Sequence, residues 1–182
     1  MRATPLPLPG VLLIEHQVFD DARGAFFESW NERDFAAAGI EARFVQENVS
    51  RSGAYVLRGL LYQIRHSQGK LVRVLAGEVF DVVVDLRRSA PTFGKSCTVQ
   101  LGAASARSLW VPAGFAHGFL ALADETHVQY KVTDFWVREA ERTLQWNDAA
   151  LGIRWPQPAG VEPLLSAKDR DGTPLARAEC FP

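Results

Sequence analysis

The stretch that decides the fold runs from Lys70 to Arg87 and reads KLVRVLAGEVFDVVVDLR. Apolar side chains recur at every second position in both halves, which predicts two β-strands, 70–75 and 79–87. Between them, Ala76-Gly77-Glu78 is short and contains a glycine, as a hairpin turn does. In the second strand, one face carries Phe80, Val82, Val84 and Leu86, and the other carries Asp81, Asp85 and Arg87.

Strand-like segments continue through the chain at intervals of roughly ten residues, separated by Gly, Pro and Asp. They are predicted at 11–19, 24–28, 42–45, 56–63, 96–101, 108–111, 118–123 and 127–131. One helix is predicted over 31–38, with Asn31 as its N-cap and Gly39 as its stop. The tail from Asn147 onward is expected to pack over the barrel as short helices and loops. We therefore expect an all-β, antiparallel sandwich or barrel in a single domain, 1–182.

Composition excludes several classes of protein. The chain is 47% hydrophobic and 23% charged with a net charge of −1, so it lacks the basic field of a nucleic-acid binder. No apolar run approaches the ~20 residues that span a bilayer, and the N-terminus does not read as a signal peptide. Neither of the two cysteines has a CxxC partner, and the four histidines show no metal-ligand spacing, so no metal is expected. A cytoplasmic enzyme or binding protein remains.

Three residues invite a chemical interpretation, each beside a structural one. His117 stands between Gly114 and Gly118, where the backbone can approach a ligand closely, but it also fits a hydrogen-bonded core histidine. Lys70 lies on an apolar strand face and would need an anion there, unless the strand begins one residue later and leaves it solvated. Tyr130 faces into the barrel and suits a general acid, or simply a partnered core hydroxyl.

Two weaker features lie in the first third of the chain. Arg23 and Glu28 flank a pair of phenylalanines, which surface ion pairing also explains. Arg58 precedes Gly59 inside an otherwise continuous strand pattern, and such a glycine often marks a bulge or a close approach to a ligand.

Ten motifs, taken in order, carry a resemblance to a known family. They are FDDARGAFFES (19–29), FVQEN (44–48), VLRGLLYQ (56–63), QGKLV (68–72), GEVFDV (77–82), SAPTFG (89–94), PAGFAHGF (112–119), YK (130–131), WND (146–148) and SAKD (166–169). Over nearly its whole length the chain resembles dTDP-4-dehydrorhamnose 3,5-epimerases of dTDP-L-rhamnose synthesis. The resemblance implies a cupin-type jelly roll without metal or cofactor, and a homodimer. It also implies a dTDP-4-keto-6-deoxyhexose substrate that is inverted at carbons 3 and 5.

The resemblance also assigns roles to residues. Tyr130 would be the acid, Asp169 the residue that orients the base, and Lys70 the cation beside the keto oxygen. Substrate contacts would come from Arg23, Glu28, Gln46, Asn48, Arg58, His117, Glu141 and Lys168, with Phe27 and Trp136 against the thymine.

Position 61 departs from the family pattern, because Leu61 stands where the family has its histidine base. A leucine cannot accept a proton, and losing a general base costs ~10²–10⁴-fold in rate. Asp169 would lose its imidazole partner and become a costly buried carboxylate. We expect a protein that binds the nucleotide sugar and turns it over slowly; a silent binding homologue and an epimerase of one carbon are the alternatives. Arg58 and Leu61 have opposite strand parity, so both reach one site only if the strand is distorted at Gly59.

Overall fold

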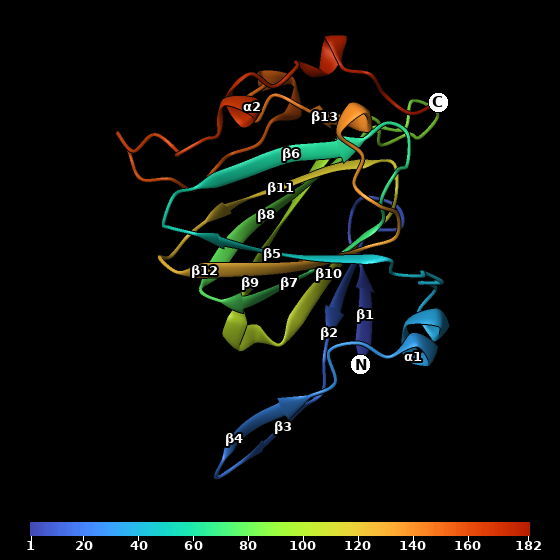
Figure 1. The fold of residues 1–182 in the computed structure, drawn as a ribbon, viewed down its shortest axis with the longest axis vertical. Coiled ribbons are helices and arrows are strands. Elements are labelled where there is room, and N and C mark those ends of the chain that lie inside the picture. Colours follow the sequence, from blue (N-terminus) through green and yellow to red (C-terminus); the bar gives the residue numbers. More distant parts are fainter.

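The computed structural model covers residues 1–182 (Figure 1). Its strands are β1 (Arg2–Pro5), β2 (Leu12–Glu15), β3 (Val18–Asp21), β4 (Gly24–Phe27), β5 (Gln46–Ser52), β6 (Leu57–Gln63), β7 (Lys70–Ala76), β8 (Glu78–Asp85), β9 (Ser96–Gly102), β10 (Arg107–Val111), β11 (Phe115–Ala121), β12 (Thr126–Val132) and β13 (Glu141–Thr143). The helices are α1 (Glu32–Ala37) and α2 (Ala167–Arg170), with 3-10 turns at Ala103–Ser105, Arg138–Ala140, Ala149–Leu151 and Leu175–Arg177.

Two antiparallel sheets face each other, and a separate hairpin projects from them. The larger sheet has the order β1-β2-β10-β7-β12-β5 and the smaller one β13-β6-β11-β8-β9. The β3–β4 hairpin pairs only with itself and extends away from both sheets (Figure 1). The prediction of an all-β antiparallel jelly roll with a few short helices is confirmed.

The space between the sheets holds an apolar core at one end. Val72 and Val74 of β7 meet Val83 of β8 and Phe115 and Phe119 of β11, all nearly free of solvent contact. Because side chains alternate along a strand, the residues between these point to the outer faces of the two sheets.

The C-terminal tail covers the outer face of the smaller sheet, as predicted. Val82, Val84 and Leu86 pack there against Leu151 of the tail, with Trp155 and Phe181 beside them. The apolar face of the 79–87 segment is therefore the one under the tail. Asp81 and Asp85, on its opposite face, are also completely buried. This strand is therefore covered on both faces, by the core between the sheets and by the tail.

Two strand predictions were wrong. The segment 11–19 is not one strand, because the chain leaves the larger sheet after Glu15 and starts the projecting hairpin at Val18. The segment 42–45 is not a strand; Ala42 and Phe44 instead pack against a small outer cluster with Phe35 and Trp110.

The strand that follows, β5, was missed because its sequence, QENVSRS, has no apolar face. Its inward side chains line a polar cavity and its outward ones are exposed, so hydrophobic alternation cannot reveal it. The short edge strands β1 and β13 were also missed. Strand β11 begins at Phe115 rather than at 118, which puts His117 inside the strand.

Helix α1 forms where its capping signals predict. The Asn31 side chain accepts hydrogen bonds from the backbone N–H groups of Arg33 and Asp34, and Phe35 is its buried residue. Gly39, with φ of +84°, reverses the chain after the last turn. No helix of the fold is both long and apolar enough to cross a bilayer.

Candidate active site

A cavity of ≈ 790 Å³ opens at the end of the sandwich where polar side chains point inward between the sheets. Strands of both sheets, the 134–137 loop and α2 supply its lining. It is lined by Gln46, Asn48, Arg58, Leu61, Tyr62, Gln63, Gln68, Lys70, His117, Gly118, Phe119, Tyr130, Trp136, Glu141, Ser166, Ala167, Lys168 and Asp169. Every site residue predicted from the sequence is in this set except Arg23, Phe27 and Glu28.

A bulge in β6 brings Arg58 and Leu61 to the same cavity. In the ladder with β11, Leu61 pairs with His117 and Arg58 with Phe119, so two residues of β6, 59 and 60, stand opposite one residue of β11. Gly59 sits in the bulge with φ of +111°, and a Cβ there would lie 2.7 Å from the Cα of Gly118. The distortion predicted at Gly59 is therefore present, and only glycines fit this crossing.

Lys70 is the first residue of β7 and points into the cavity, where only 8% of its surface is exposed. Its Nζ donates to the carbonyl oxygen of Leu61 at 3.0 Å. Burial lowers the pKa of Lys70 to about 8, against the opposing charges of Glu141 and Asp81. The interpretation of Lys70 as a solvated flank is thus wrong, and the side chain is an ammonium held ready for an anionic partner.

Tyr130 faces the cavity from β12 of the larger sheet, beside the buried Val128 and Val132. Burial raises the pKa of its phenol. The hydroxyl therefore keeps its proton at neutral pH and is a donor available to a bound molecule.

His117 faces the cavity from β11 of the smaller sheet, on the wall opposite Tyr130. Its Nε2 lies 2.9 Å and 3.0 Å from the two carboxylate oxygens of Asp81 on the neighbouring strand β8. His117 is thus both a hydrogen-bonded histidine and a cavity residue. Asp81 was not predicted as a site residue, and its only signal in the sequence is an aspartate within a largely apolar strand.

Asp169 is buried at the start of α2 and lines the cavity next to β6. Its carboxylate accepts hydrogen bonds from the Ser166 hydroxyl at 2.7 Å and from the backbone N–H of Gly59 at 3.3 Å. As expected, no imidazole reaches Asp169 from position 61, but these two donors satisfy part of its hydrogen-bonding capacity.

Trp136, Glu141 and Lys168 form a connected group in the cavity wall. Glu141 accepts from the Trp136 indole N–H at 3.1 Å and pairs with the Lys168 ammonium at 2.7 Å. The backbone N–H of Trp136 donates to Gln46 at 3.0 Å, which fixes the half-exposed indole at the edge of β5. A flat aromatic surface next to a cation suits the nucleobase and the phosphate of a nucleotide.

Two glutamines that sequence reasoning missed hold the loop that carries Trp136. Gln63 donates to the carbonyl oxygen of Phe135 at 3.1 Å and accepts from the backbone N–H of Val137 at 2.6 Å. Gln68 donates to the carbonyl oxygen of Asp134 at 2.8 Å. No sequence signal marks them, since their partners lie about seventy positions away.

Arg23, Phe27 and Glu28 lie on or just after the projecting hairpin, outside the cavity. Arg23 is exposed and pairs with Asp21 at 2.6 Å, as the ion-pair interpretation predicted. The Arg73 guanidinium lies 4.5 Å from the centre of the Phe27 ring, on the outer side of the larger sheet. The structure therefore does not bring these three residues to the cavity of their own chain.

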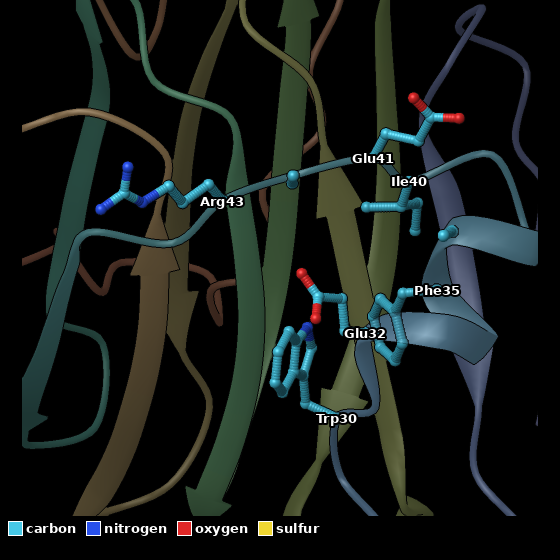
Figure 2. A pocket seen from close by; sticks show the side chains of 8 residues that line it. Trp30, Glu32, Phe35, Ile40, Glu41 and Arg43 are labelled. Carbon is cyan, nitrogen blue, oxygen red and sulfur yellow. The ribbon is translucent and has the colours of Figure 1, made fainter.

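A second hollow of ≈ 230 Å³ lies against α1. Figure 2 shows Trp30, Glu32 and Phe35 grouped there, while the charged ends of Glu41 and Arg43 point away. Its lining includes no histidine, lysine or tyrosine. The structure gathers no group of three His, Cys, Asp or Glu side chains able to hold a metal ion.

The fold and the larger cavity define a class of protein. A jelly roll that sets a phenol and a buried ammonium against an imidazole–carboxylate pair is built as an acid–base enzyme. The chain belongs to the dTDP-4-dehydrorhamnose 3,5-epimerase family, whose model matches residues 5–177, and is thus of an isomerase family.

Individual relatives agree with this assignment. The dTDP-4-dehydrorhamnose 3,5-epimerase of Pseudomonas aeruginosa is 55% identical, with 100% of both chains covered. The Legionella pneumophila enzyme, solved in complex with dTDP-4-keto-L-rhamnose, has a TM-score of 0.93 and 42% identity over 98% of this chain and 94% of that one. A 3'-monoepimerase from Streptomyces bikiniensis in complex with dTDP-quinovose has a TM-score of 0.88 and 33% identity over 94% and 87%.

Proposed function

We propose that the cavity binds a dTDP-4-keto-6-deoxyhexose and that the protein inverts carbons 3 and 5, slowly because residue 61 is leucine. The observation that carries this proposal is the meeting of Tyr130 and Lys70 with His117 and Asp169 in one cavity. Both carbons adjoin the keto carbon, so their protons become acidic once the enolate oxygen is stabilised. The substrate class follows from the family and from the ligand of the Legionella relative.

Each side chain has a role that its position supports. The Lys70 ammonium stabilises the enolate oxygen, and Tyr130 returns a proton from the wall of the larger sheet. Arg58 and Lys168 supply positive charge for the diphosphate, and Trp136 offers a face to the thymine. Gln46 and Asn48 give polar contacts from β5 of the larger sheet and Glu141 gives one from β13 of the smaller sheet, and Asp169 lines the same cavity as Leu61.

The hairpin residues enter the proposal through a homodimer. We propose that the β3–β4 hairpin of one copy reaches the cavity of the other and presents Arg23, Phe27 and Glu28 there. In support, Phe19 and Phe26 on the hairpin are 56% and 70% exposed. An apolar two-stranded hairpin without a partner is marginally stable in water. A single domain over residues 1–182 and a cytoplasmic location are also proposed, and the two free cysteines favour the latter.

Solvent exchange tests the proposal. The protein is incubated in D₂O with the 4-keto sugar, and deuterium at carbons 3 and 5 is followed by NMR and mass spectrometry. Slow exchange at both carbons, and rhamnose after addition of a downstream reductase, is the expected result. Exchange at one carbon would replace the proposal with the mono-epimerase alternative. Binding without any exchange would support a silent homologue, which Leu61 favours.

A further inference from the structure

The paired side chains of His117 and Asp81 are the least explained feature of the cavity. His117 is the sole imidazole among the lining residues, and both side chains are buried. The two carboxylate oxygens of Asp81 lie 2.9 and 3.0 Å from His117 Nε2. Because a carboxylate accepts hydrogen bonds, this contact favours the tautomer with the proton on Nε2. The other nitrogen, Nδ1, then carries a free lone pair. It makes no hydrogen bond within the protein and is not sealed from solvent, so it opens to the cavity.

The position of His117 in the sheet makes this lone pair relevant to residue 61. His117 pairs directly with Leu61 in the ladder between β11 and β6. Directly opposed residues in antiparallel strands have Cβ atoms about 4.5–5.5 Å apart. The imidazole therefore lies on the same wall as Leu61, facing Tyr130 across the cavity.

The other candidate bases of the cavity are already engaged. The Asp169 carboxylate accepts from the Ser166 hydroxyl and the Gly59 N–H. The Glu141 carboxylate is paired with the Lys168 ammonium and the Trp136 indole. Only the His117 imidazole combines a free acceptor atom with a carboxylate that holds its ring and fixes its tautomer.

We propose that His117 is the catalytic base of this chain, with Asp81 as its positioning residue; this rests on the proposed function. The C–H bond next to the keto group breaks, its proton passes to Nδ1, and its electrons form the enolate beside Lys70. Tyr130 then gives its hydroxyl proton to the opposite face of the carbon. The imidazolium releases a proton to water and the phenolate takes one back, so the cycle closes without a co-reactant.

Five proteins test this proposal: the unmodified chain, His117→Asn, His117→Ala, Asp81→Asn and the control His66→Asn. His66 is exposed and lies outside the cavity, beside Asp134. Deuterium exchange into the 4-keto sugar is measured against pH, and dTDP affinity is measured by calorimetry. The remaining ionisable side chains that line the cavity are Arg58, Tyr62, Lys70, Tyr130, Glu141, Lys168 and Asp169.

His117→Asn should lower the exchange rate at least ~100-fold with dTDP affinity little changed, and His66→Asn should change neither. Asp81→Asn should lower the exchange rate with dTDP affinity little changed, because the His117 ring loses the acceptor that fixes its tautomer. Added imidazole should restore part of the exchange in His117→Ala. These readouts do not follow from a purely structural role.

The outcomes separate the two proposals. Equal exchange by His117→Asn and the unmodified chain would overturn the assignment of His117 and leave the epimerase function standing. Binding of dTDP by the unmodified chain without any exchange would also overturn it. Failure of the unmodified chain to bind dTDP would instead remove the proposed function itself.

Discussion

Replacing Leu61 with histidine is the most informative single change. Leu61 lines the cavity, is partly exposed and belongs to none of the three apolar clusters. The substitution should therefore cost about 1 kcal/mol of stability or less. A histidine there would stand in the strand whose Gly59 N–H already binds the Asp169 carboxylate, so a partner for its ring lies beside it.

The gain in rate follows from the worth of a positioned base. General-base catalysis contributes ~10²–10⁴-fold, or about 3 to 5 kcal/mol of the barrier, and this is the upper limit of the gain because His117 is proposed to act as a base already. Deuterium exchange at carbons 3 and 5 measures this gain, with Leu61→Gln as a matched polar control that cannot act as a base. Equal exchange by the two variants, with dTDP affinity retained in both, would refute the reasoning.

Three further changes test separate parts of the structure. Turnover should fall as pH rises through about 8, because the Lys70 ammonium loses its proton there, and Lys70→Arg should remove that limb of the rate profile; a limb unchanged in Lys70→Arg would assign it to another group. Asn31→Ala removes the acceptor that caps α1 and should cost ~1 kcal/mol in urea unfolding; an unchanged midpoint would show that the cap contributes nothing. Phe26→Glu should convert a dimer to a monomer in light scattering and slow exchange, because its ring is 70% exposed on the hairpin; an intact dimer would exclude a hairpin-mediated interface.

Hydrophobic periodicity predicted the strands that have an apolar face and failed to predict the strand whose inner face is polar and lines the cavity. The 70–87 hairpin followed from alternation, and the α1 cap followed from Asn31. Strand β5 did not, because a strand with a polar inner face carries no hydrophobic period. The glycine bulge in β6 was predicted only because two residues of opposite parity had been assigned to one site.

Some residues of the candidate site were predicted from the sequence, and others became apparent only in the structure. Resemblance in ordered motifs selected Tyr130, Lys70 and Asp169, and the cavity contains all three. It did not select Asp81, whose meaning depends on a histidine 36 positions away in the chain. It also could not reveal that the hairpin residues lie outside the cavity of their own chain.

The sequence by itself determined the antiparallel β architecture, the family and the leucine at position 61, because alternation, capping and motif order are local properties of the chain. Only the tertiary structure decided that His117 lies opposite Leu61 with its ring on Asp81, and that Asp169 has donors without an imidazole. These facts depend on which strands become neighbours and in what register. Register is set by the packing of the whole sandwich and by the bulge at Gly59, so no single segment of the sequence contains it.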